Sequence, residues 1–297
     1  MKSFTKTFTL LFSLALLGFS VYALLDAFAI RRVYATVEPS AGPAAEAQAQ
    51  TLSASAAAVS TDTSYSDGSV SIQIDTYREN GTTIHVADIY LSGTASLQTA
   101  FSQNSYGRNV TAATSATAGA VDALLAVNGD NYGSREAGYV IRNGVLYRDR
   151  SAGDQEDLVI WADGSFTIVN ESEVTAQELL DAGAVQVFSF GPGLLLDGEI
   201  TVGQSEEVDR AMVSNPRTAI GMLEPGHYVL VVSDGRTGES KGLSLYQLAQ
   251  FLQSLGVQTA YNLDGGGSST MVFQGQVVNT PSGRSGERAV TDIVYIA

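Results

Sequence analysis

The chain contains no cysteine, and only two of its 297 residues are histidines. The missing cysteine excludes disulfides, thiolate metal ligands and a cysteine nucleophile. With His85 and His227 alone, a zinc site would have to consist mostly of carboxylates. Basic residues are also scarce, because 16 Lys and Arg face 31 Asp and Glu, for a net charge of −15. Since phosphate polymers repel an acidic chain, we expect no nucleic-acid partner.

The N-terminus carries a long uncharged run, from Thr7 to Leu25. As a helix rising 1.5 Å per residue it nearly spans a hydrocarbon core of about 30 Å. We interpret residues 1–32 as a hydrophobic helix that is either a signal anchor or a signal peptide, and Ala27-Phe28-Ala29 has the small-x-small form of a cleavage site. We therefore expect a single-pass protein at the cell membrane with its C-terminal domain extracytoplasmic, or a secreted one if the signal is cleaved.

Residues 33–67 are rich in Ala, Ser and Thr and poor in large apolar residues. Such a segment cannot offset its ordering entropy by burial, so we expect a flexible, disordered stalk. The folded domain is then residues 68–297.

Short strands dominate this domain. Alternating patterns around turn residues predict β-hairpins over residues 69–91, 157–169 and 219–233. Helices are predicted over residues 175–182 and 245–255, the second with a capping box formed by Ser244 and Gln247. The fold class is α+β: a single mixed, largely antiparallel β-sheet domain with a few helices.

The most unusual local segment is Asn262-Leu263-Asp264-Gly265-Gly266-Gly267-Ser268-Ser269-Thr270. Consecutive glycines permit close approach of the backbone and can direct successive N–H groups into one concavity, which binds anionic oxygens. Ser268, Ser269 and Thr270 add hydroxyl groups, and Asp264 adds a carboxylate. A plain flexible turn is the alternative reading.

Further polar clusters stand at the ends of predicted strands. They are Asn128-Gly129-Asp130, Pro216-Arg217-Thr218-Ala219, Asp234-Gly235-Arg236 and Glu287-Arg288. Each could be an ordinary turn or surface charge. Arg217 stands among apolar residues, so we expect it to pair with an anion, either a protein carboxylate or a ligand phosphate.

Taken in order, these segments, together with Ser189-Phe190-Gly191-Pro192-Gly193, resemble the phosphodiester glycosidase family over about residues 70–297. That family includes the uncovering enzyme, which removes N-acetylglucosamine from a phosphodiester, and bacterial exopolysaccharide-related proteins. The resemblance implies an extracytoplasmic hydrolase that cleaves the C1–O–phosphate bond of a sugar-1-phosphodiester. The products are free sugar and a phosphomonoester, and the substrate class is a phosphorylated cell-envelope or exopolysaccharide glycan.

The resemblance also assigns roles. Asp264 and Asp130 are the candidates for nucleophile or base and for acid, in either order, and Arg217 leads the phosphate site. Arg288 is a second phosphate ligand with Glu287 as its partner. The remaining substrate-binding candidates are Asn128, Asn262, Gly265, Gly266, Gly267, Ser268, Ser269, Thr270, Asp234 and Arg236.

No cofactor is expected, although calcium or magnesium held by Asp130, Asp264 and the phosphate stays an alternative. Two rival functions remain open. One is a non-catalytic cell-surface module that binds phosphorylated glycans. The other is a structural envelope protein whose glycines serve only a tight turn.

Overall fold

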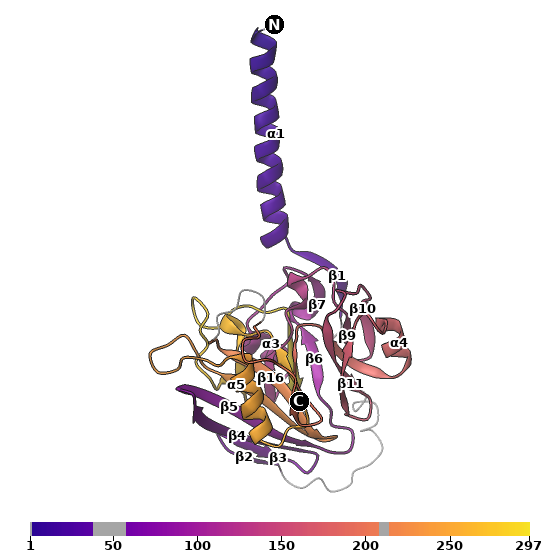
Figure 1. Cartoon of the computed structure of the whole chain (residues 1–297), viewed down its shortest axis with the longest axis vertical. Coiled ribbons are helices and arrows are strands. Elements are labelled where there is room, and N and C mark those ends of the chain that lie inside the picture. Colours follow the sequence, from indigo (N-terminus) through magenta and orange to yellow (C-terminus); the bar gives the residue numbers. More distant parts are fainter. Residues whose placement is uncertain (1, 38–57, 208–213) are drawn as a thin grey trace.

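The computed structural model describes residues 2–37, 58–207 and 214–297. Helix α1 (Lys2–Phe28) projects from a body made of sheets (Figure 1). Its segment Lys6–Phe28 is long and apolar enough to cross a membrane, and none of its most apolar stretch is buried against the rest of the chain. A signal anchor and a signal peptide both fit this helix.

Strands occupy both ends of the range that we expected to be a flexible stalk. Strand β1 (Arg32–Thr36) pairs with β7 (Ser105–Arg108), and β2 (Val59–Ser60) and β3 (Ser64–Ser66) form one edge of the widest sheet. Edge strands are held by backbone hydrogen bonds and need few apolar side chains, so composition did not indicate them. Residues 38–57 lie outside the described residues.

The widest sheet has nine strands in the order β15-β14-β18-β16-β17-β5-β4-β3-β2. Its strands not yet given are β4 (Val70–Glu79), β5 (Thr82–Leu91), β14 (Gly193–Leu196), β15 (Glu199–Ile200), β16 (Arg217–Glu224), β17 (His227–Ser233) and β18 (Thr259–Leu263). Asn80 and Gly81 join β4 to β5 with φ of 51° and 68°. Two successive positive φ values are what a two-residue hairpin turn of type I′ requires, and the Asn-Gly pair supplies them at little cost.

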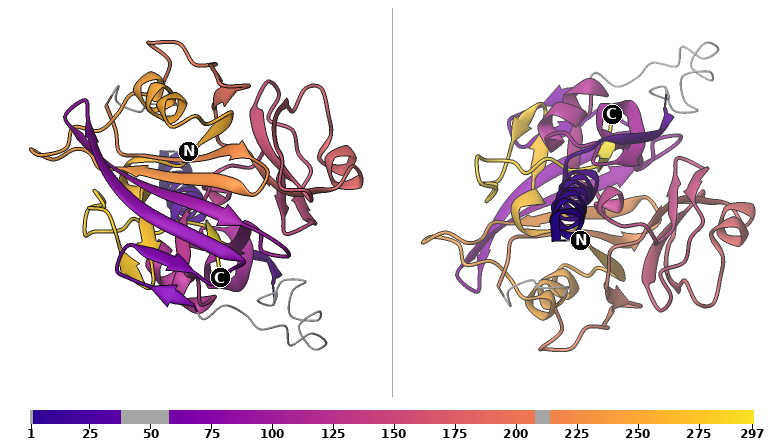
Figure 2. Two further views of the ribbon diagram at one scale, coloured as in Figure 1. Left: turned by 90° about the horizontal axis from the view of Figure 1, so that it is seen from below. Right: turned by 90° about the horizontal axis from the view of Figure 1, so that it is seen from above.

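Two five-stranded sheets complete the body. The first, in the order β10-β9-β13-β11-β12, contains β9 (Val140–Arg142), β10 (Val145–Arg148), β11 (Glu156–Trp161), β12 (Phe166–Asn170) and β13 (Ala184–Phe188). The second, in the order β20-β19-β8-β21-β6, contains β6 (Gln98–Phe101), β8 (Leu125–Asn128), β19 (Met271–Phe273), β20 (Gln276–Val277) and β21 (Asp292–Ile296). The first sheet and its helix α4 (Ala176–Asp181) lie to one side of the nine-stranded sheet (Figure 2).

The main core lies where the three sheets meet, and it joins Ile72, Leu125 and Leu158 in one cluster of buried side chains. A second cluster forms under helix α5 (Leu245–Ser254), whose apolar stripe packs on the nine-stranded sheet. Helix α3 (Thr114–Ala120) packs on β8 and β21 and was not predicted. Its sequence of Thr, Ser, Ala and Gly shows no helical periodicity of apolar residues, so packing against the neighbouring sheet stabilises this helix.

The α+β class with largely antiparallel sheets is confirmed, since every strand pairing among the described residues is antiparallel. The three predicted hairpins correspond to β4–β5, β11–β12 and β16–β17. The predicted helices correspond to α4 and α5, and the capping box of Ser244 and Gln247 is present.

Candidate active site

The glycine-rich segment connects β18 to β19 and bends through a short 3-10 turn, η3 (Gly266–Ser268). At Gly265 a Cβ atom would lie 2.9 Å from the carbonyl oxygen of Pro216, and Gly266 has a φ of +63°. Both positions therefore require glycine, for space in the first case and for conformation in the second. The loop lies tightly against the strand that begins at Arg217.

The amide of Gly266 is not free to join the anion nest that we expected of the three glycines. The amide of Gly266 donates to the carbonyl of Pro216 at 2.8 Å, and the amides of Ser268 and Ser269 donate back to Gly265 and Gly266. Amides that are already paired cannot bind a ligand without breaking those bonds. What the missing side chains provide is room for two arginines.

Arg288 and Arg236 lie on opposite parts of this glycine loop. Arg288 donates from Nε to the Ser268 hydroxyl and from Nη2 to Asp264, both at 2.7 Å, and its side chain is half exposed. Arg236 is exposed, and its Nη2 lies 3.1 Å from where a Cβ of Gly266 would be. Arg236 is anchored by donating to the Asn215 side-chain oxygen at 2.7 Å. Two guanidinium groups thus reach solvent beside a backbone without side chains, an arrangement suited to a phosphate.

Asp264 lies at the base of this arrangement and is only 6% exposed. Burial raises the pKa of its carboxyl group, while Arg288, the Ser268 hydroxyl and the Gly265 amide lower it; burial is the stronger effect. The carboxyl is therefore a better proton acceptor than a free aspartate, yet it remains paired with a cation.

Arg217 does not join the two exposed arginines. It is 3% exposed and donates from Nη2 to the Glu207 carboxylate at 2.5 Å and from Nε to the Leu243 carbonyl at 2.9 Å. Burial lowers its pKa more than Glu207 raises it. Of the two partners that the sequence left open, the structure selects the protein carboxylate.

The two asparagines act as clamps between loops. Asn128 donates to the Asp264 carbonyl at 2.6 Å, and its side-chain oxygen accepts from Thr218 and from the amide of Thr270. Asn262 donates to the Gly191 carbonyl at 2.8 Å. Both are buried and fix the loop, and their contact with sugar hydroxyls stays a prediction. The hydroxyls of Ser269 and Thr270 are buried as well and have no partner among the described residues.

Asp234 and Glu287 also have protein partners. Asp234 accepts from the amide of Thr280 at 2.8 Å and from Asn279 at 3.3 Å. Burial raises its pKa, but nearby His85, at 3.7 Å, and hydrogen bonds from Thr280 and Asn279 outweigh it, so the net shift is downward.

Glu287 accepts from the amide and hydroxyl of Ser115. It is therefore not the partner of Arg288, whose partner is Asp264.

Asp130 lies in a different cluster. Its carboxylate accepts from Arg142 at 2.8 Å and from the amides of Ser189 and Tyr132, and it is 0% exposed. Arg142 also pairs with Asp292 at 2.9 Å. Burial and the nearby Asp130 raise the pKa of Asp292 to about 7, although Arg142 opposes them.

Asp130 and Asp264 therefore have separate sets of partners. In the part of the chain that the structure describes, no group of three or more His, Asp or Glu side chains is arranged to hold a metal ion. No local pattern indicated the Asp130 cluster, because Arg142 and Asp292 are 150 positions apart.

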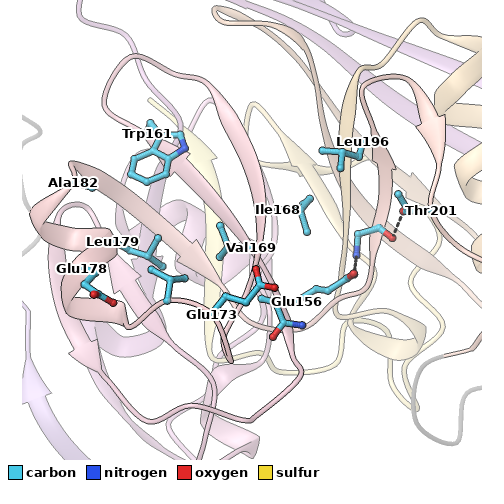
Figure 3. Close-up of a pocket in the computed structure, with 13 residues that line it drawn as sticks. Glu156, Trp161, Ile168, Val169, Glu173, Glu178, Leu179, Ala182, Leu196 and Thr201 are labelled. Atoms are coloured by element: carbon cyan, nitrogen blue, oxygen red, sulfur yellow. Dashed lines mark hydrogen bonds between the residues drawn. The ribbon is translucent and has the colours of Figure 1, made fainter.

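A cavity of about 770 Å³ lies elsewhere (Figure 3). It is bounded by β12, α4 and the region of Gly193 to Thr201, and it contains none of the predicted site residues. Glu156, Glu173 and Glu178 line it without a basic residue. Because these carboxylates would repel a phosphate, the phosphate site is better placed at the glycine loop.

Comparison with known proteins identifies the protein family. A family model described as phosphodiester glycosidase matches residues 120–297. The chain belongs to the phosphodiester glycosidase family.

Its relatives include the SPbeta prophage-derived uncharacterized protein YomE of Bacillus subtilis (strain 168), 34% identical over 59% of this chain and 28% of that protein. The human N-acetylglucosamine-1-phosphodiester alpha-N-acetylglucosaminidase is 32% identical over 56% of this chain and 35% of its own length. The chain thus spans about a third of the curated relatives that it matches.

Solved structures agree on the fold. The zebrafish N-acetylglucosamine-1-phosphodiester alpha-N-acetylglucosaminidase catalytic domain, auto-inhibited by its pro-peptide, matches with a TM-score of 0.59 at 25% identity. That match covers 76% of this chain and 82% of the zebrafish chain. A hypothetical protein from Synechocystis, at 17% identity and a TM-score of 0.55, matches over 77% of this chain and 62% of its own and shares the fold.

Proposed function

We propose that the chain is an extracytoplasmic hydrolase that cleaves the C1–O–phosphate bond of a sugar-1-phosphodiester. The sugar is of the N-acetylglucosamine type, and the natural substrate is a phosphorylated glycan of the cell envelope or an exopolysaccharide. Family membership and the names of the vertebrate relatives support the reaction class. The apolar helix α1 supports a location at or beyond the membrane.

One observation carries the proposal: Arg236 and Arg288 flank a glycine loop whose base is the Asp264 carboxylate. In the proposed complex the phosphate lies between the two guanidinium groups, in the space that side chains at Gly266 and Gly267 would fill. Arg288 then contacts both the phosphate and Asp264. This contact brings the carboxylate beside the sugar carbon that carries the phosphate.

The reaction needs little acid catalysis, because the phosphomonoester is a good leaving group. The C1–O bond breaks with its electron pair leaving on the phosphate oxygen, and Arg236 and Arg288 stabilise that negative charge. Positive charge develops at C1, where Asp264 stabilises it and accepts the proton of the attacking water. The pKa of Asp264, raised by burial, suits a proton acceptor.

Asp130 is a positioning residue in this proposal. Its carboxylate holds the amides of Tyr132 and Ser189 and does not reach solvent. The site accordingly works with a single reacting carboxylate, Asp264.

The test uses the full chain in a neutral detergent with a panel of sugar-1-phosphodiesters that begins with N-acetylglucosamine. Mass spectrometry follows free sugar and phosphomonoester. Asp264→Asn is compared with Asp163→Asn, which alters an exposed carboxylate in the β11–β12 turn. Sugar release that only Asp264→Asn abolishes supports the proposal. Diester that binds without cleavage would overturn it in favour of a glycan-binding module.

A further inference from the structure

Although Arg217 is buried, its side chain lies against the same glycine loop as the exposed Arg236. A Cβ atom at Gly265 would lie 3.9 Å from the Cδ atom of Arg217, and one at Gly266 would lie 3.1 Å from Nη2 of Arg236. The two arginines thus approach consecutive positions of the loop. Burial lowers the pKa of Arg217 most, Glu207 raises it, and repulsion from Arg236 lowers it further. Two cations that repel each other favour an anion that contacts both.

The anion that Arg217 holds in this structure, the Glu207 carboxylate, is incompletely bound. Its Oε2 atom accepts from Nη2 of Arg217 at 2.5 Å, whereas its Oε1 atom is buried and has no hydrogen-bond partner among the described residues. A buried carboxylate oxygen without a donor costs free energy and reduces what the ion pair contributes. Glu207 belongs to neither a helix nor a strand, and its side chain is 14% exposed. Rotation about the bonds of the side chain can therefore withdraw the carboxylate.

An unpaired acceptor lies on the same face of the nine-stranded sheet as Arg217. Asn262 is directly opposite Ala219, and Arg217 precedes Ala219 by two residues, so the three side chains share one face. The Oδ1 atom of Asn262 is buried and has no hydrogen-bond partner among the described residues. Residues at diagonal positions of adjacent strands are close enough for one ligand to contact both. A sugar phosphate meets both needs, because a hydroxyl group donates to Asn262 while a phosphate oxygen accepts from Arg217.

We propose that the Glu207 carboxylate occupies the place of a phosphate oxygen on Arg217 and competes with the substrate phosphate for that guanidinium group. When the side chain of Glu207 rotates away, Arg217 becomes a third phosphate ligand beside Arg236 and Arg288. The two non-bridging oxygens of a phosphodiester can accept from two different guanidinium groups, whereas Glu207 pairs with Arg217 alone. The inference deepens the proposed function and rests on it for the ligand, the phosphate of a sugar-1-phosphodiester.

The test measures binding of inorganic phosphate to the full chain in a neutral detergent by isothermal titration calorimetry. Glu207→Gln keeps the shape of the side chain and removes its charge. It should bind phosphate about tenfold more tightly than the parent, as expected when the competing contact is formed in roughly nine molecules of ten. Binding that equals the parent's, or no binding at all, would overturn the proposal.

Glu206→Gln is the matched control for the loss of one negative charge. Glu206 is exposed and accepts from the amide of Gly203 at 2.9 Å. Because salt screens exposed charges, this variant should bind phosphate within about twofold of the parent. A gain as large as that of Glu207→Gln would mean a general effect of charge and would overturn the proposal.

Two further variants show whether Arg217 is the group that becomes available. Glu207→Gln combined with Arg217→Gln should lose the gain, and a double variant that keeps it would contradict the assignment to Arg217. Glu207→Asp keeps the charge and shortens the side chain, so it should bind phosphate more tightly than the parent and less tightly than Glu207→Gln. If the melting temperature shows that Glu207→Gln does not fold, Glu207→Asp decides the question, and parent-like binding in it would overturn the proposal.

The titration measures binding without turnover, so it separates this inference from the proposed function. A chain that cleaves no diester of the panel and still shows the gain in Glu207→Gln would lose the proposed reaction and keep the competition at Arg217. A chain that cleaves a diester, but whose parent and Glu207→Gln forms bind phosphate equally, would keep the reaction and exclude the role of Glu207.

Discussion

Replacing Arg142 by methionine should destabilise the domain strongly, because two buried carboxylates share this one cation. The guanidinium group contacts Asp130 at 2.8 Å and Asp292 at 2.9 Å, and the side chain is 2% exposed. Arg142 also donates to the Val187 carbonyl in the neighbouring strand β13. Methionine keeps much of the volume and none of the charge, so both carboxylates would remain buried without a cation.

Breaking a buried ion pair by removing one partner costs about 3–5 kcal/mol. For a domain of this size each kcal/mol lowers the melting temperature by about 2–4 °C, so we expect a loss of roughly 6–20 °C. The same substitution of an arginine on the surface should lower the melting temperature far less. Arg150→Met is the matched control, since the Arg150 side chain is 69% exposed and its nearest carboxylate oxygen is 4.0 Å away.

The loss of stability in Arg142→Met should also depend on pH. Burial already raises the folded pKa of Asp292 to about 7, above its ordinary value of 3.8, and Arg142 is the group that opposes the rise. A carboxyl whose folded pKa exceeds the unfolded one binds protons in the folded state, so stability falls as pH rises between the two values. Without Arg142 the folded pKa rises further. Arg142→Met should therefore lose more free energy of unfolding at pH 8 than at pH 5.

The assay is urea denaturation of the full chain in a neutral detergent at both pH values, followed by circular dichroism. A deficit under about 1 kcal/mol at pH 8 would refute the reasoning, since it would mean that the carboxylates do not need the cation. A deficit that is larger at pH 5 than at pH 8 would refute the assignment of the charge states.

Three further substitutions probe the site and the fold. Arg288→Gln should lower turnover of a sugar-1-phosphodiester about a hundredfold or more, as loss of one charge-stabilising donor does; an unchanged kcat would remove Arg288 from the site. Gly266→Ala should cost about 1–2 kcal/mol, because φ is +63° there, and should displace Arg236; calorimetry and a rate assay that both match the parent would contradict this. Ser244→Ala should lose about 1 kcal/mol at the cap of α5 with turnover unchanged, and a fall in turnover would show that α5 also supports the site.

Local signals predicted the local parts of the fold. The pair of Ser244 and Gln247 marked the start of α5, and Gly256, with a φ of +84°, lies just past its C-terminal end. Asn80-Gly81 fixed the β4–β5 turn. Each of these features depends on residues within a few positions of one another. Strand β1 escaped prediction because its partner β7 lies far along the chain. Strands β2 and β3 pair with neighbouring segments and escaped prediction because they are short and poor in large apolar residues.

The same distinction between local and long-range interactions explains which parts of the candidate active site could be predicted. Asp264, Arg236 and Arg288 come together at the glycine loop and had all been predicted to lie in the site. The direction of a side chain, however, depends on the sheet that holds it. Asp130 turns inward to Arg142, for which nothing in its local sequence gives a reason. Arg217 pairs with Glu207, and its apolar neighbours predicted an anionic partner without deciding between a protein carboxylate and a phosphate. Sequence therefore predicted the loops that form the site better than the partner of each charged group.

The most direct test of the central claim is the position of an oxygen label. The full chain is incubated with an N-acetylglucosamine-1-phosphodiester in ¹⁸O water, and the products are weighed by mass spectrometry. A glycosidase that uses Asp264 at C1 places the label in the released sugar and leaves the phosphomonoester unlabelled. Label in the phosphomonoester would mean attack at phosphorus, and it would contradict the account of Arg236, Arg288 and Asp264 given above.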